Sequence, residues 1–220
     1  CEHAVALAPN DPTPWVVLQN IAQGLRYGND EYRGIWHEIV SREPLHVAAH
    51  SSAMLYWLPR WFGSDELVEA FVEDATRGRP PGSLLTQIRL QWLYMERIPR
   101  TADERTAFYH GPMVASAIDA AIEDLHAASP EHPSYATQRH WLAYFLTQSG
   151  RYTEAYQMFQ AIGPYYGSWP WLLANDPATR FTGVRADAVL GWEDAGRPSL
   201  PGESAAESAA GSAVADTRSI

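Results

Sequence analysis

The sequence predicts an all-α protein built as a stack of helical hairpins, and three observations lead to this prediction. Apolar residues recur at the three- and four-residue spacing of amphipathic helices, for example between residues 65 and 77. Helix-ending prolines stand at Pro9, Pro44 and Pro80, at intervals of 35 and 36 residues. Glycine, asparagine and aspartate occupy the short breaks between the helical stretches.

The helices are placed from these breaks and from their capping residues. Pro14 suits the first turn of a helix, and Gly28-Asn29-Asp30 is a stop followed by a cap. The link from Pro99 to Gly111 is longer than a repeat allows, so we expect a mobile loop there. The predicted helices cover residues 15–27, 31–42, 45–57, 65–77, 83–95, 112–128, 134–147, 152–162 and 177–190. The first helix should carry four apolar side chains on one face, namely Trp15, Leu18, Ala22 and Leu25.

Two stretches resemble the tetratricopeptide repeat. The opening Ala4–Trp15 is similar to a junction between such repeats, where a helix ends, prolines interrupt the chain and a Trp opens the next helix. Gly150-Arg151-Tyr152, with Ala155 and Phe159, matches the family pattern Gly-x-Tyr-x-x-Ala-x-x-x-Phe. The resemblance implies a right-handed α-α superhelix, a tetratricopeptide-like solenoid of about four hairpins plus a terminal capping helix.

The stretch Pro44 to Glu96 also resembles a family of uncharacterised bacterial helical proteins, a domain of unknown function. Its pattern contains an Arg/Lys-Trp-x-Gly-Ser turn, present here with Arg in place of Lys and with Phe62 where a small residue is expected. The matching residues are Ala49-His50, Arg60-Trp61-Phe62-Gly63-Ser64, Phe71 and Pro81-Gly82-Ser83. The resemblance implies helical-repeat architecture and brings no known reaction.

Composition narrows the function classes. All sixteen basic residues are Arg, so the chain is lysine-free, which excludes a Schiff-base lysine and a P-loop lysine. The net charge of −10 argues against nucleic acid as a partner. The apolar runs are too short for a membrane span, and abundant Arg and Ala suggest a bacterial source, so we expect a bacterial cytoplasmic protein. No cofactor is predicted. The repeat domain should cover residues 1–196, followed by an Ala/Ser/Gly-rich disordered tail over 197–220.

Candidate binding residues follow from the repeat register. The first helix of each hairpin should line a concave face, which places Asn20 and Gln23 there in the first hairpin, and His140 and Tyr144 in the fourth. His46 and His50 are four residues apart on one helix, a spacing that could hold a metal. No third ligand accompanies them, so we predict no metal site and interpret His50 as a packing residue.

The aromatic stretch Tyr165–Trp171 has two interpretations. It could form a binding wall through Tyr166 and Trp169, or it could pack the last helix against the fourth hairpin, which we favour. No catalytic motif is present, so the sequence favours a protein- or peptide-binding scaffold, with homo-oligomer formation left open. The alternative is an enzyme or small-molecule binder whose pocket lies under the 98–111 loop and the 165–171 stretch, with His110 or His140 as a base.

Overall fold

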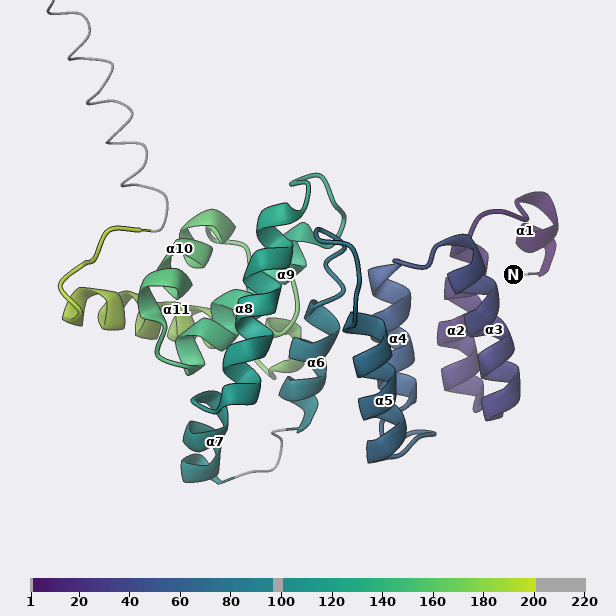
Figure 1. Cartoon of the computed structure of the whole chain (residues 1–220), viewed down its shortest axis with the longest axis horizontal. Helices are drawn as coiled ribbons and strands as arrows, with labels where there is room; N and C mark the ends of the chain where they lie inside the picture. The colour runs from purple at the N-terminus through teal and green to yellow at the C-terminus, as the bar shows by residue number, and fades with distance from the viewer. Residues whose placement is uncertain (1, 97–100, 201–220) are drawn as a thin grey trace, which may run out of the picture. The chain divides into compact units, whose positions relative to one another are not determined.

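The computed structural model describes residues 2–96 and 101–200, and within them the fold is entirely helical (Figure 1). These residues form eleven α-helices and one short 3-10 helix, and they contain no strand, which confirms the all-α prediction. The helices are α1 (Glu2–Leu7), α2 (Thr13–Leu25), α3 (Asn29–Arg42), α4 (Val47–Tyr56), α5 (Asp65–Thr76), α6 (Gln87–Glu96), α7 (Ala102–Tyr109), α8 (Pro112–Ala127), α9 (Tyr135–Gln148), α10 (Tyr152–Ile162), η1 (Trp171–Leu173) and α11 (Pro177–Asp194).

The chain divides into two compact units. The first unit contains Cys1–Pro99 and Ala120–Tyr135, and the second contains Arg100–Asp119 and Ala136–Ile220. The division falls inside α8, so neither unit is one continuous stretch of sequence.

In the first unit, consecutive helices pair as hairpins. Helices α2 and α3 lie side by side, as do α4 and α5, and α6 packs against both α4 and α5 (Figure 1). Local chemistry sets the helix starts. Pro14 lies in the first turn of α2. The Glu31 carboxylate accepts from the backbone N–H of Gly28, and the Ser64 hydroxyl accepts from that of Leu67 at 3.2 Å.

Helix α2 buries the predicted face in part, with Ala22 buried and Trp15 and Leu18 half-buried. Leu25 was expected to point inward but is 66% exposed, whereas Gln19 is buried beside Ala22. The Gln19 amide donates to the Tyr32 hydroxyl at 3.0 Å and to the backbone carbonyl of Ala49 at 3.1 Å. Because a buried amide is costly without hydrogen bonds, these two bonds of the NH2 group offset part of that cost, while the side-chain carbonyl oxygen of Gln19 is buried without a partner among the described residues.

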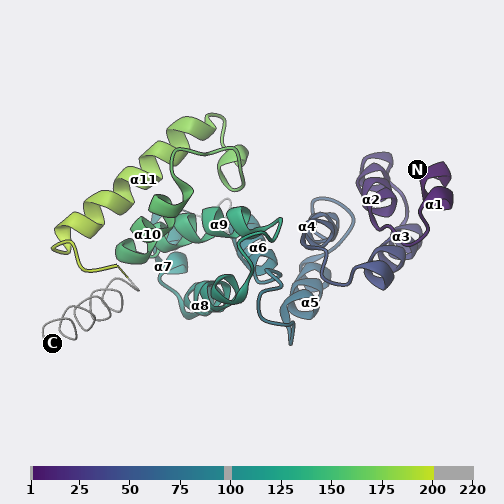
Figure 2. The same cartoon turned by 90° about the horizontal axis from the view of Figure 1, so that it is seen from above.

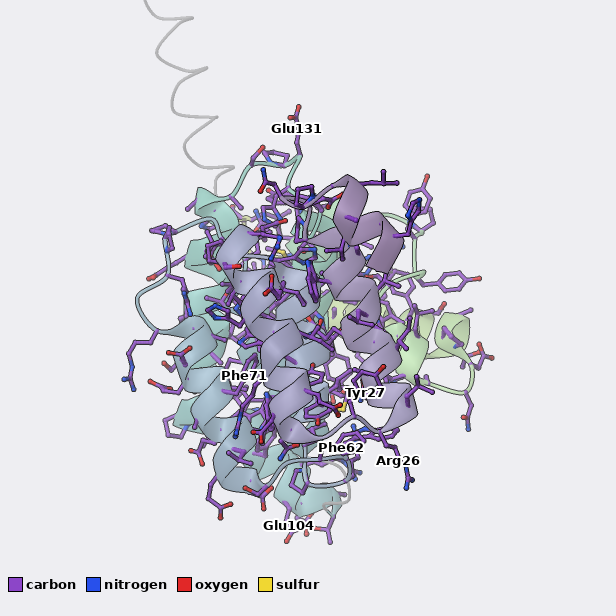
Figure 3. All side chains as sticks on the ribbon, turned by 90° about the vertical axis from the view of Figure 1, so that its right-hand side faces the viewer. Arg26, Tyr27, Phe62, Phe71, Glu104 and Glu131 are labelled. Atoms are coloured by element: carbon purple, nitrogen blue, oxygen red, sulfur yellow. The ribbon has the colours of Figure 1, made fainter. Side chains whose placement is uncertain are left out.

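Stacked aromatic rings join the end of α4 to α3 and to the turn that follows α4. The Tyr56 ring lies parallel to that of Tyr32, with 3.5 Å between the ring centroids, and to that of Phe62, with 4.6 Å. The Tyr56 hydroxyl donates to the carbonyl of Tyr27, and Tyr27 and Phe62 lie at the same end of this group of helices (Figure 3). The turn is tight at Gly63, where an added Cβ would lie 1.9 Å from the carbonyl oxygen of Trp57.

The last part of the first unit holds an earlier turn in place. Asp124, in α8, is buried, and its carboxylate accepts from the backbone N–H of Gly82 at 2.6 Å and from the Thr86 hydroxyl at 2.8 Å. Ala121 and Leu125 on the same helix are also buried. The 120–135 stretch is therefore part of the core of the first unit.

In the second unit, α10 and α11 lie side by side (Figure 2). Ala155 and Phe159, the two apolar positions of the tetratricopeptide pattern, are both buried on α10. Gly191 on α11 lies so close to the Tyr152 ring that an added Cβ would be 2.3 Å from it. Small residues at this crossing allow the two helices to approach closely.

The link before Gly111 is a helix and not a loop, so the predicted mobile loop is wrong for residues 102–109. Helix α7 begins after Thr101, whose hydroxyl accepts from the backbone N–H of Glu104, while Glu104 accepts from the backbone N–H of Thr101 at 2.8 Å. This reciprocal pair is a capping box. Residues 97–100, including Pro99, lie outside the described residues, as do Cys1 and residues 201–220 of the predicted tail.

Every helix within the described residues falls short of the length and apolar character needed to cross a membrane.

Candidate functional site

A pocket of about 270 Å³ opens in the first unit, and we call it the His50 pocket. Its walls come from α3, α4 and α5 and from the turns that follow α3 and α5. The lining residues are Trp36, Val40, Pro44, His50, Phe71, Asp74, Ala75 and Arg79. Phe71 extends from α5 (Figure 3). Its ring lies 5.5 Å from that of Trp36, and the edge of the His50 ring meets Trp36 at 4.8 Å, both measured between centroids.

His50 lines this pocket, and one of its two ring nitrogens has a free lone pair. Its Nδ1 lies 3.0 Å from the carbonyl oxygen of His46, and because a carbonyl can only accept, Nδ1 carries the proton. The pKa of His50 is lowered to about 4, mainly by burial and to a smaller extent by the Arg79 guanidinium, while the hydrogen bond to the His46 carbonyl opposes the change. The ring is therefore neutral at pH 7, and its Nε2 is a hydrogen-bond acceptor with no partner among the described residues.

Charged groups lie at the rim of the pocket. The Arg79 guanidinium donates through Nε to the carbonyl of Ala75 at 3.2 Å and through Nη2 to that of Asp74 at 2.9 Å. These two backbone bonds fix its orientation. The Asp74 carboxylate is 3.7 Å from Nη2, but its side chain is 90% exposed, so solvent screens this ion pair.

The two histidines considered as metal ligands both contact the backbone. The Nδ1 of His46 accepts from the N–H of Ala49 and caps α4, while His50 donates to the carbonyl of His46. Within the described ranges no group of three or more His, Cys, Asp or Glu side chains is placed to hold a metal ion. His50 is 2% exposed, as expected for a packing residue.

A second candidate site is the 165–173 segment of the second unit, which joins α10 to α11. One side chain of this segment is inserted into the core and several point outward. Trp171 is fully buried, and its indole N–H donates to Nδ1 of His140 at 2.8 Å. Its ring also meets that of Phe181 on α11 edge to face, at 5.3 Å between centroids. The exposed large side chains of the segment are Tyr165, Tyr166, Trp169, Leu172 and Leu173.

The predicted residues of α9 lie inside the second unit. His140 accepts from Trp171, and burial lowers its pKa to about 4. Tyr144 is 1% exposed, and its hydroxyl lies 3.1 Å from that of Tyr109 and accepts from Arg180 at 3.1 Å. The expectation that these two side chains lie on an open face is therefore wrong, because both are enclosed by packed rings.

The other predicted residues are accessible to different degrees. On α2, Asn20 is exposed and Gln23 is half-buried. Tyr166 and Trp169 are exposed in the 165–173 segment. A partner could therefore reach Asn20 directly, while Gln23 offers only part of its side chain.

Sequence reasoning did not single out the His50 pocket. Trp36 and Phe71 are aromatic residues of the kind that usually pack between helices, and Arg79 and Asp74 carry no motif. The signal that could have found the pocket is a histidine in an apolar helix face, combined with an Arg that follows the next helix of the same hairpin. Such a combination becomes a site only when the fold brings α3, α4 and α5 together.

No family model, no curated protein and no solved structure matches this chain significantly.

Proposed function

We propose that this chain is a protein- or peptide-binding helical repeat protein, and that the 165–173 segment binds an apolar stretch of the partner. The observation that carries the proposal is the exposure of large apolar side chains on this segment, with Tyr165 75% and Trp169 46% exposed. Large apolar side chains that gather on a protein surface often mark an interaction site, and these lie within nine residues of sequence. Aromatic side chains are also the commonest binding hot spots.

The way in which the segment is anchored supports this proposal. Trp171 is fixed by the His140 hydrogen bond and by Phe181, so the backbone that carries the exposed rings is held before a partner arrives. A surface ordered in advance loses less conformational entropy on binding. The proposal includes a tetratricopeptide-like superhelix, which agrees with the side-by-side hairpins of the first unit and with the buried Ala155 and Phe159 of the second.

The test has two steps. The wild-type chain first serves as bait to capture a partner from extracts of the source organism. The affinity of the purified partner is then measured for the wild type and for two variants. The double variant Tyr165→Ser with Trp169→Ser removes the exposed rings. Leu190→Ser, at a 58% exposed position on α11, is the matched control because it removes a similar apolar side chain from the same unit. We expect the double variant to bind the partner at least about tenfold more weakly, as for loss of a hot spot, and the control to bind like wild type.

Melting temperatures should agree among the three proteins, because the altered residues are exposed. Equal affinity of the wild type and the double variant for the purified partner would overturn the proposal.

A further inference from the structure

We propose that the His50 pocket binds a single-ring phenol that carries a carboxylate, with the phenol hydroxyl donating to Nε2 of His50 and the carboxylate accepting from Arg79. The ring of the ligand lies against Trp36 and Phe71. This binding site is separate from the 165–173 segment and does not depend on the function proposed for that segment.

The size and walls of the pocket select the body of the ligand. At about 270 Å³ the pocket is small for a ligand site, and it has room for a single-ring ligand. Trp36 and Phe71 both line the pocket, and their rings are in edge contact with each other, 5.5 Å apart between centroids and inclined at 65°. Flat aromatic ligands gain from edge and face contacts with such rings.

The free lone pair on the His50 ring selects the hydroxyl group. Nε2 of His50 bears a lone pair, because Nδ1 donates to the His46 carbonyl and the ring is neutral. A ligand O–H group can donate to this lone pair, which receives no hydrogen bond from the described residues. A phenol suits this role because its hydroxyl remains protonated at neutral pH.

The guanidinium at the rim selects the carboxylate. Arg79 donates only to the carbonyls of Asp74 and Ala75 among the described residues, which leaves Nη1 available. Its side chain is 29% exposed and thus reachable from the pocket mouth. Arginine binds carboxylates through charge-assisted hydrogen bonds. The exposed Asp74 carboxylate competes weakly, since it is 3.7 Å away and solvated.

The first experiment is calorimetric titration of the whole chain at pH 7 with 4-hydroxybenzoate, and with benzoate and phenol as comparison ligands. Benzoate lacks the hydroxyl and phenol lacks the carboxylate. We expect 4-hydroxybenzoate to bind at least about tenfold more tightly than either, because a site built around a polar group discriminates against analogues that lack it. Equal affinities for the three compounds, or no binding of 4-hydroxybenzoate at millimolar concentration, would overturn the proposal.

Two variants and a matched control assign the contacts. Arg79→Gln should reduce the affinity for 4-hydroxybenzoate to that for phenol. Arg77→Gln should change nothing, because Arg77 is exposed and pairs with Glu73 at 2.9 Å outside the pocket. Full affinity in Arg79→Gln, or an equal loss in Arg77→Gln, contradicts the assigned role of Arg79.

His50→Phe keeps a ring in place but removes Nε2, and should reduce the affinity for 4-hydroxybenzoate to that for benzoate. Circular dichroism checks that this variant folds. If it does not, the nitrogen-15 resonance of His50 Nε2 in the wild-type chain decides the question. This resonance should shift upon addition of 4-hydroxybenzoate and stay in place with benzoate; an unmoved resonance refutes the hydrogen bond.

Discussion

Two histidines, His50 in the first unit and His140 in the second, are kept neutral by burial. The pKa of each is about 4 in the folded chain, against an ordinary value of 6.5. Between these values the unfolded chain binds protons that the folded chain does not, so the free energy of unfolding decreases as the pH falls. At pH 5 we expect a loss of about 2 kcal/mol per histidine relative to pH 7.5.

Urea unfolding between pH 7.5 and 5, followed by circular dichroism, measures this loss. His50→Phe should show a shallower decrease than the wild type, because one of the two titrating groups is gone. Parallel curves for the two proteins would show that His50 is protonated without cost in the folded state.

Gly63 is the position where a single methyl group should be most damaging. Its added Cβ would lie 1.9 Å from the backbone carbonyl oxygen of Trp57, so the turn between α4 and α5 has to move. We expect Gly63→Ala to lower the free energy of unfolding by about 2–4 kcal/mol. Gly34, in the middle of α3, has nothing within 4 Å of an added Cβ. Gly34→Ala should therefore stabilise the chain by about 0.5–1 kcal/mol.

Chemical denaturation of both variants checks the contrast, and similar changes in the two would contradict the turn geometry. Gly63 belongs to the Arg-Trp-x-Gly-Ser turn recognised in the sequence. Its need for glycine comes from backbone contact, which no pattern of side chains reveals.

At the scale of single elements, helices were predicted well wherever a local signal was used. Helix α10 covers Tyr152–Ile162 as predicted, because glycine stops the chain before it and the apolar spacing is regular. Helix α7 was missed although its capping box, Thr101 followed by Glu104, is visible in the sequence. A link of this length was interpreted as a loop, but it has room for the two turns of helix that follow the cap.

Removing the cap should loosen α7 without unfolding the chain. Thr101→Ala deletes the hydroxyl that accepts from the N–H of Glu104, a loss of about 1 kcal/mol for an N-cap. Hydrogen exchange of residues 102–109 should become faster by about fivefold, while α9 and α10 remain unchanged. Thr101→Ser retains the hydroxyl and should exchange like wild type; unchanged protection in Thr101→Ala would show that other contacts hold α7.

The 165–173 segment shows why the candidate site was only partly predictable. Packing and exposure were treated as alternatives, but Trp171 is buried while Trp169 is exposed two residues earlier. His140 and Tyr144 were placed by repeat register on an open face. They are enclosed because Trp171 and Phe181, from later parts of the chain, cover them. Contacts of this kind link residues 27 or more positions apart and leave no local pattern.

At the scale of the whole molecule, the repeat interval predicted the hairpins but not how they group. The first unit needs residues 120–135, since Asp124 binds the Gly82 turn across 42 positions of sequence. A fragment of residues 1–135 should therefore unfold at a higher urea concentration than a fragment of residues 1–99. Identical midpoints would show that the first 99 residues form a self-sufficient core.

The interleaving of the two units affects how the protein is made. Residues 120–135, which complete the first unit, are translated after residues 100–119 of the second unit. Parts of both units therefore leave the ribosome before all residues of either unit have been made. The nascent chain cannot finish its N-terminal half first, and a premature stop anywhere before Asp124 leaves an exposed apolar core for chaperones and proteases to recognise.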